Sequence, residues 1–143
     1  MALTELIYVS NLVGESEHEL GAILESSVRH NQLNGITGML LYYRGGLMQV
    51  LEGEDLQVQE TYGRICADTR HRDILTLSSS EIPGRHFENW SMGYKYVDPT
   101  AVEKFPKYAP FFNFRTDADK IKGAPGLALE MLTMFANGMK SAG

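Results

Sequence analysis

The sequence lacks the residues and runs that several classes of protein require. Cys66 is the only cysteine among 143 residues, which excludes an intrachain disulfide and any zinc site built on cysteines. Basic residues are scarce, with 13 Lys and Arg against 18 Asp and Glu and a net charge of −5, so we expect no nucleic-acid partner. The longest apolar runs, such as residues 39–43, are far shorter than the ~18 residues that a membrane span requires.

Common catalytic and metal-binding motifs are missing as well. The sequence contains no G-x-G-x-x-G after its first strand-like run, no G-x-x-x-x-G-K-[ST], no H-E-x-x-H and no G-x-S-x-G. The four histidines never fall four residues apart, the spacing that places two ligands on one helix face, so we expect no metal site. Because no basic and apolar leader precedes Leu6, we expect the chain to remain in the cytoplasm.

The length of 143 residues and the hydrophobic share of 43% suit one globular domain with one core. Alternating or β-rich runs predict strands at residues 4–10, 36–43, 47–52, 74–82 and 87–97. Helical periodicity predicts helices at residues 17–30 and 54–67, with a turn at residues 31–35 and with Cys66 as a buried thiol on the second helix. The order β-α-β-β-α-β-β predicts an α+β protein of ferredoxin-like type with an added fifth strand and both helices on one sheet face.

The last third of the chain has a different character. Prolines at positions 99, 106, 110 and 125 interrupt the pattern before a helix predicted at residues 126–140. This helix is apolar on more than one side, so we expect it to pack on the open face of the sheet or on another subunit. We expect residues 98–143 to be a helical extension and not an independent domain.

Two polar side chains occupy positions that the strand pattern directs into the core. Gln49 shares a strand face with Leu47 and Leu51, and Tyr8 lies in the middle of the first strand. A buried amide or hydroxyl without a partner costs about 1–3 kcal/mol, so we expect these two side chains to bond to each other if their strands are neighbours. Taken singly, each is more simply a core residue that bonds to another nearby group.

Further polar residues turn this pair into a candidate binding site. Asn31, Asn34, Arg64 and the turn at residues 68–71 join Tyr8 and Gln49 in indicating a bound polar heteroaromatic ligand. A flavin suits such a site, because the edge of its isoalloxazine ring alternates carbonyl oxygens with an N–H, and an amide offers both a donor and an acceptor. A tyrosine beside an excited flavin can release an electron and a proton, and the adjoining amide can then reverse its orientation without any substrate.

Five segments of the sequence match a known pattern when they are read together. They are residues 6–10 (LIYVS), Asn31 with residues 34–40 (NGITGML), residues 49–53 (QVLEG), residues 68–71 (DTRH) and residues 87–92 (FENWSM). In their order and separations they resemble the BLUF family of flavin-binding blue-light sensors. The resemblance covers residues 1–97 and implies a ferredoxin-like domain there, with FAD or FMN held noncovalently between the two helices.

The resemblance implies which residues carry out the light reaction. Tyr8 would donate the electron and the proton, and Gln49 would rearrange between Tyr8 and the flavin. Trp90 and Met92 would relay the change from Gln49 to the surface, although core filling is the commoner role of such residues. Leu47 departs from the family pattern, in which an aromatic residue is frequent two positions before the glutamine.

The same resemblance implies which residues surround the cofactor. Asn31 would bond the pyrimidine edge of the ring, His30 would lie beside it, and the ring would pack between Ile23 and Ile65. The far carbonyl, the ribityl chain or the phosphate would lie near Arg64, Asp68, Arg70 or His71. Cations such as Arg70 and His71 are also favourable at the end of any helix, whatever binds nearby.

The function that this resemblance implies is a photoreceptor and not an enzyme. Because the likeness fades beyond residue 97, we expect the signal to reach a separate, unidentified partner protein, and we expect a homo-oligomer. Two alternatives stay open at this stage. The first is a small flavin-dependent reductase or a light-independent ligand-binding module on the same fold. The second is an oligomer building block without any cofactor.

Overall fold

The computed structural model describes residues 3–13, 16–43, 45–88, 93–96, 126 and 128–134. The elements in chain order are β1 (Leu3–Leu12), α1 (Ser16–Asn34), β2 (Thr37–Tyr43), β3 (Gly46–Glu54), α2 (Asp55–Ala67), β4 (His71–Ile82) and β5 (Gly93–Tyr96). The predicted order of strands and helices is therefore confirmed. No helix within these described residues is long and apolar enough to cross a membrane.

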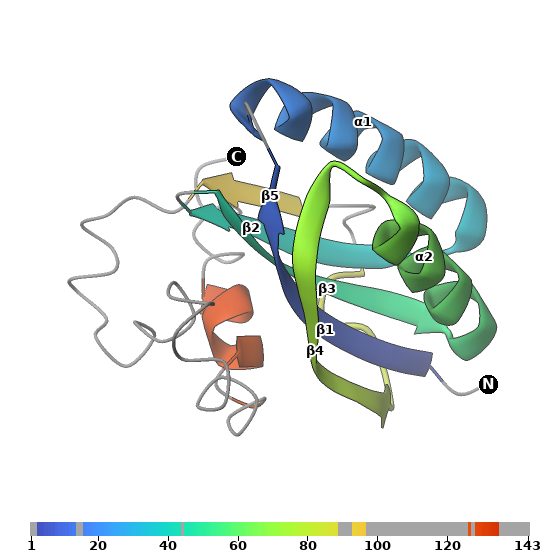
Figure 1. Cartoon of the computed structure of the whole chain (residues 1–143). Helices are drawn as coiled ribbons and strands as arrows, with labels where there is room; N and C mark the ends of the chain where they lie inside the picture. Colours follow the sequence, from blue (N-terminus) through green and yellow to red (C-terminus); the bar gives the residue numbers. More distant parts are fainter. Residues whose placement is uncertain are drawn as a thin grey trace.

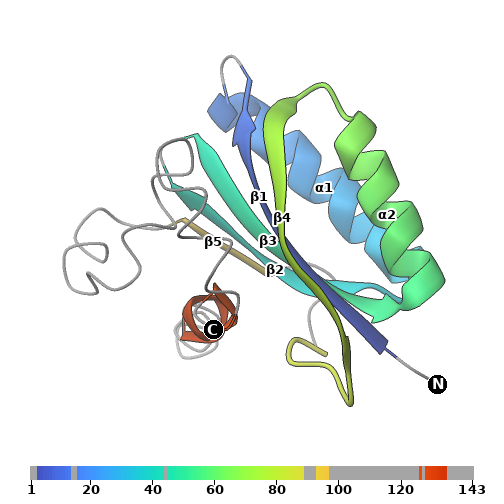
Figure 2. The same ribbon diagram turned by 60° about the horizontal axis from the view of Figure 1, so that its bottom comes forward.

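The five strands form one sheet in the order β4-β1-β3-β2-β5. β1 lies antiparallel between β3 and β4, β2 is antiparallel to β3, and β5 joins the outer side of β2 in parallel. The first four strands have the ferredoxin-like arrangement and β5 is the predicted addition. Figures 1 and 2 show α1 and α2 together on one face of this sheet, as the sequence predicts.

The sheet is covered on both faces, which explains why its central strands are buried almost continuously. Every residue from Thr4 to Ser10 is buried, although successive side chains of a strand point to opposite faces. On the second face lies the helical segment at residues 128–134, drawn in red in Figure 2. Its residues Ala128, Met131 and Leu132 have no exposed surface within this single chain. Of the two predicted positions for the last helix, the described part occupies the open face of the sheet.

The end of α1 differs from the prediction. Asn31 and Asn34 were assigned to a turn by their composition, but both belong to the last turn of the helix. The helix ends at Gly35, which has a positive φ of 65°, and the Ile36 N–H donates to the Asn31 carbonyl over 3.0 Å. This geometry is a common way of closing a helix, because glycine adopts positive φ without steric cost.

Two other predictions need correction. Cys66 is exposed and not buried, because it lies on the solvent side of α2. The predicted last strand at residues 87–97 begins too early, since Phe87 and Glu88 lie in a bend and a turn. The part of it that the structure describes as a strand is β5, Gly93–Tyr96. Trp90 and Met92 lie outside the described residues, as do residues 135–140 of the predicted last helix.

Candidate functional site

A pocket opens between α1 and α2 over the helix-covered face of the sheet. Its walls are formed by Tyr8, Ile23, Ser26, Ser27, His30, Asn31, Leu40, Leu47, Gln49, Leu51, Thr61, Arg64, Ile65, Asp68, Arg70 and His71. The ten residues that the family resemblance implies around a cofactor all line this pocket, whereas Asn34, which the sequence also indicated for the site, does not. The ten come from two helices, from the strands β1, β3 and β4 and from the turn before β4, so only the folded chain brings them together.

Tyr8 and Gln49 form the floor of the pocket. They are direct partners in the register of β1 and β3, and their exposed fractions are 2% and 3%. The Tyr8 hydroxyl donates a hydrogen bond to Gln49 Oε1, which confirms the contact predicted from the strand pattern. Burial, the largest influence, raises the pKa of Tyr8 well above its ordinary value of 10.0. The phenol is therefore a neutral hydrogen-bond donor that keeps its proton over the whole physiological range.

A second tyrosine holds the Tyr8 ring in place. Tyr62 of α2 packs against Tyr8 with ring centroids 5.3 Å apart and ring planes tilted by 45°. The Tyr62 hydroxyl lies 2.6 Å from that of Thr76, which is the register partner of Tyr8 on β4. Tyr62 does not line the pocket itself, so its contacts orient the Tyr8 ring from behind.

His30 is fixed in its neutral form at the side of the pocket. The guanidinium of Arg64 contacts His30 Nδ1, and the Thr61 hydroxyl lies 3.0 Å from Nε2. Because a guanidinium can only donate, Nδ1 accepts and Nε2 carries the hydrogen that it donates to Thr61. Burial and the Arg64 charge together lower the pKa of His30. Asn34 does not line the pocket, and its amide donates to the His30 carbonyl over 2.8 Å.

His71 closes the pocket next to Tyr8. Its Nδ1 lies 2.9 Å from the Ser10 hydroxyl, and its Nε2 bonds to the carbonyl of Ile65. Because a carbonyl can only accept, Nε2 donates to it, and both ring nitrogens are engaged within the protein. His71 can therefore offer a bound molecule the face of its ring, but no additional hydrogen bond.

Arg70 carries a positive charge at the rim of the pocket. The Asp68 carboxylate holds its guanidinium with distances of 2.6 Å to Nη2 and 2.9 Å to Nε, and it also accepts the Arg70 backbone N–H over 2.9 Å. These hydrogen bonds, chiefly the side-chain ones, lower the pKa of Asp68. The guanidinium is thus fixed in one orientation near the end of α2.

The chemistry of the lining fits a flat ring with a polar edge. Asn31, with an exposed fraction of 2%, and Gln49 bring two buried carboxamides to the pocket, and each offers a donor and an acceptor. Ile23 and Ile65 supply apolar surface from the two helices. Leu47 is buried in the same lining, at the position where the family that the sequence resembles often has an aromatic residue. This combination suits the isoalloxazine ring of a flavin.

Several lining residues were not predicted from the sequence. Ser27 follows Ile23 by four positions on α1, and Thr61 precedes Ile65 by four positions on α2. Residues four apart lie on the same side of a helix, so the helical repeat around the predicted residues would have pointed to both. Small hydroxyl side chains carry no distinctive signal of their own.

The comparisons with known proteins agree with this site. A family model named BLUF and described as "Sensors of blue-light using FAD" matches residues 3–93. The chain is 35% identical over 92 residues to the photoactivated adenylate cyclase subunit beta of Euglena gracilis, which covers 63% of this chain and 11% of that protein. It is also 35% identical over 86 residues to the blue light- and temperature-regulated antirepressor BluF of Escherichia coli (strain K12), covering 59% of this chain and 21% of that protein. The chain thus spans about a fifth or less of these curated relatives.

Solved structures of similar size give the same result over most of the chain. The ground state of BlsA superposes with a TM-score of 0.76 at 29% identity, covering 92% of this chain and 87% of BlsA. The dark state of BlrB, a BLUF protein, superposes with a TM-score of 0.69 at 26% identity, covering 90% and 97% of the two chains. The family model, the relatives and the fold agree, and the chain belongs to the BLUF family of blue-light sensors, which bind a flavin.

Proposed function

We propose that this chain senses blue light through a flavin nucleotide, FAD or FMN, held noncovalently in the pocket between α1 and α2. The observation that carries the proposal is the hydrogen bond from the buried Tyr8 hydroxyl to the Gln49 amide in the floor of that pocket. A phenol and a carboxamide in direct contact, both facing a site for a flat polar ring, are what a light-driven proton and electron transfer requires.

Different lining residues contact different parts of the cofactor. Asn31 and Gln49 bond to the polar edge of the ring, and Ile23 and Ile65 pack on its faces. His30 flanks the ring as a neutral side chain. The far carbonyl, the ribityl chain or the phosphate lies near Arg64, Asp68, Arg70 or His71. Of these, His71 offers the face of its ring and no hydrogen bond, because both of its ring nitrogens are already bonded.

Light absorption is followed by a change in the hydrogen bonds of Gln49. A bound flavin supplies the absorption of blue light and accepts an electron and a proton. Tyr8 gives up both, and its proton leaves along the hydrogen bond to Gln49. The amide of Gln49 then rearranges, because the group it bonded to has changed, and an amide that turns over exchanges its donor and acceptor. No step consumes a substrate, so the chain acts as a sensor and not as an enzyme.

The register of the sheet supplies a direct route from this change to the sheet edge. Tyr8, Gln49, Leu40 and Tyr94 are successive register partners across β1, β3, β2 and β5. A displacement of the Gln49 backbone thus reaches β5 after crossing β2 alone. We propose that the signal shifts β5, with Trp90 and Met92 in the segment before it, and the C-terminal helix.

The output is proposed to be the control of a separate partner protein. Two of the relatives are named as an adenylate cyclase subunit and an antirepressor, and this chain corresponds to only 11% and 21% of them. We further propose that residues 1–97 form the flavin-binding unit and residues 98–143 the extension that meets the partner. A homo-oligomer and a cytoplasmic location stay predictions from the sequence.

The test is the absorption spectrum of the purified chain before and after blue illumination. We expect flavin bands that shift reversibly to longer wavelength and recover in the dark. Tyr8→Phe and Gln49→Leu should bind flavin and lose the shift. Tyr62→Phe is the matched control and should keep the shift, because it removes a hydroxyl outside the pocket lining and retains the ring that packs against Tyr8.

Other outcomes of this experiment are equally informative. A colourless protein after expression with abundant flavin would contradict the proposal. Bleaching that lasts only while NAD(P)H is present would indicate a reductase instead. Release of the cofactor by denaturation, followed by chromatography, distinguishes FAD from FMN.

A further inference from the structure

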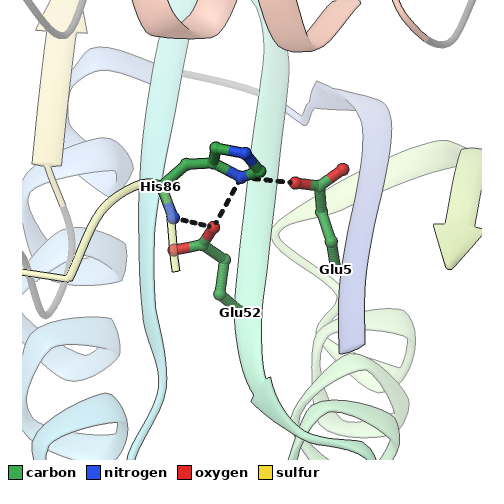
Figure 3. Close-up of side chains that lie close together, drawn as sticks. All are labelled: Glu5, Glu52 and His86. Atoms are coloured by element: carbon green, nitrogen blue, oxygen red, sulfur yellow. Dashed lines mark hydrogen bonds and ion pairs between the residues drawn. The ribbon is translucent and has the colours of Figure 1, made fainter. Parts of the chain in front are cut away.

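A second polar cluster lies on the sheet face opposite the flavin pocket (Figure 3). Glu5 precedes Tyr8 by three positions on β1 and Glu52 follows Gln49 by three on β3, so both carboxylates point away from the pocket. The two glutamates are direct register partners, and their side chains are 6% and 0% exposed. His86, in the segment after β4, places its Nδ1 3.1 Å from Glu5 Oε2 and 3.3 Å from Glu52 Oε2.

The two carboxylates differ in how they are satisfied. Glu52 Oε1 accepts the backbone N–H of Phe87 over 2.9 Å and the hydroxyl of Thr37 over 3.2 Å, and Glu52 Oε2 accepts the backbone N–H of His86 over 2.7 Å. Glu5, although more than nine-tenths buried, bonds among the described residues only to His86 Nδ1, and no described group donates to its Oε1. Glu5 therefore has fewer hydrogen bonds to the protein than Glu52 has, although no fully buried side-chain oxygen or nitrogen of the described residues lacks a partner.

Within the described part of the chain, the cluster pairs two carboxylates with a single imidazole. Like charges directly opposite each other on paired strands are destabilising. The guanidinium of Arg85, the residue before His86, donates to the Thr37 hydroxyl and to the carbonyls of Glu52 and Gly35, and no hydrogen bond or ion pair of the described residues joins it to either carboxylate. Among the described residues, the cation-forming group that contacts both glutamates is the His86 imidazole, whose side chain is 43% exposed.

We propose that Glu5, Glu52 and His86 bind a divalent transition-metal ion of the zinc class. Their three ligand atoms lie within 4.8 Å of one another. An ion with four ligands at about 2.0–2.2 Å holds adjacent ligand atoms roughly 3.3–3.6 Å apart, and two of the three spacings here are 3.1 and 3.3 Å. The ion would offset the repulsion between the two facing carboxylates.

The ligand types select the class of metal. One imidazole nitrogen with two carboxylate oxygens suits zinc and its neighbours, whereas magnesium and calcium prefer oxygen ligands throughout. The exposed side of His86 gives the ion access from solvent and leaves a coordination position for water. Thr37 and the two backbone N–H groups on Glu52 hold that ligand in place, as outer hydrogen bonds do in metal sites.

Metal binding at this cluster would fasten three parts of the chain together. Glu5 belongs to β1, Glu52 to β3, and His86 to the segment that follows β4. The spacing of histidines in the sequence excluded only sites on a single helix face, and this site joins residues 81 positions apart. Because the cluster is on the face opposite the pocket, the binding does not depend on flavin or on light.

Cobalt(II) is the probe that tests the site, because a four-coordinate cobalt ion absorbs visible light strongly and zinc displaces it. The full chain, free of any affinity tag and of metal, is titrated with cobalt and then with zinc at mildly alkaline pH, where imidazole is free to coordinate. We expect one cobalt ion per chain, displacement by zinc, and a higher melting temperature with zinc. Magnesium and calcium at the same concentration should leave the melting temperature unchanged.

Variants separate this site from adventitious binding. His86→Gln and Glu5→Gln should weaken cobalt binding by more than about tenfold. Glu81→Gln, which removes an exposed carboxylate from β4, should leave it unchanged. Because the His86 side chain is partly exposed, its variant should keep the wild-type far-ultraviolet circular dichroism and fold. The absence of a saturable cobalt band, or equal affinities of the wild type and His86→Gln, would overturn the proposal.

Discussion

At the scale of the residue, the protonation of Tyr8 sets a clear expectation. Burial raises the pKa of Tyr8 far above its ordinary value of 10.0, so its phenol should stay neutral at pH 10, where an exposed tyrosine is half ionised. We expect the light-induced spectral shift to persist up to pH 10 for as long as circular dichroism shows a folded protein. A loss of the shift with the titration curve of an ordinary tyrosine would mean that Tyr8 is accessible to solvent.

His30 gives a second prediction at this scale, on stability against pH. Its pKa is lowered in the folded protein, chiefly by burial and next by Arg64, so the unfolded chain binds the proton more readily. The contribution of His30 is therefore complete above its ordinary pKa of 6.5 and is lost as the pH falls toward the lower folded value. Between about pH 7 and pH 5, the free energy of unfolding should fall less steeply for His30→Gln than for the wild type.

Urea denaturation of both proteins with saturating flavin measures this difference, because the other titrating groups are common to both. Parallel pH curves would show that the imidazole has the same pKa in the folded and unfolded states. A steeper curve for the variant would reverse the sign and indicate that a carboxylate stabilises the charged form.

The position of a single side chain could be predicted where the repeat of a strand or helix fixes the face on which it lies. Tyr8 and Gln49 stood out because strand alternation sends two polar groups into an apolar core, and they do meet there. Glu5 and His86 could not be paired in this way, since their contact depends on where an irregular segment returns to the sheet. Cys66 was misplaced because a helix face assigned from apolar periodicity is wide enough to include a residue at its exposed margin.

At the scale of the element, the pairing of β2 with β3 depends on a glycine. Gly38 is buried opposite Leu51, and a Cβ atom at this position would collide with the Val50 carbonyl oxygen. Backbone atoms inside a sheet cannot move aside cheaply. We expect Gly38→Ala to lower the free energy of unfolding by about 1–3 kcal/mol, with the change measured by chemical denaturation.

Gly63 provides the matched control within α2. A Cβ atom there meets nothing within 4 Å, and the position is exposed on the helix. Gly63→Ala should raise the free energy of unfolding by roughly 0.5–1 kcal/mol, because alanine loses less backbone entropy in a helix than glycine does. Equal effects of the two substitutions would show that β2 and β3 are not packed as closely at Gly38 as described.

Element types were predictable where periodicity was strong, and element ends were not. Both helices and the first four strands follow patterns that the core enforces. The end of α1 was misjudged because asparagine and glycine favour turns and helix ends alike, and the backbone geometry at Gly35 decided between them. The last strand was predicted to start too early, since the alternating pattern continues through Phe87 and Glu88 although these residues form a bend and a turn.

At the scale of the whole molecule, the sheet separates the light-sensing side from the other side. The pocket and its two helices lie on one face, and residues 128–134 lie on the other (Figure 2). A signal that reaches this segment must pass through or around the sheet. The register row from Tyr8 through Gln49 and Leu40 to Tyr94 joins the floor of the pocket to the β5 edge, and β4, which pairs directly with β1, forms the other edge. The choice of face for the last helix could not be predicted, because its apolar residues would also have suited a second subunit.

This path leads to a prediction about where light loosens or tightens the structure. β5 is bonded to the rest of the described sheet through β2 alone. Opening its backbone hydrogen bonds therefore costs less free energy than opening those of a central strand. We expect blue light to alter amide hydrogen exchange at β5 and at residues 128–134. The exchange of β4, on the far edge and bonded to β1, should change much less. Gln49→Leu should abolish the difference between darkness and light. Equal changes at both edges, or a change at β4 alone, would require the signal to leave the pocket through Tyr8 and β1 instead of through Gln49.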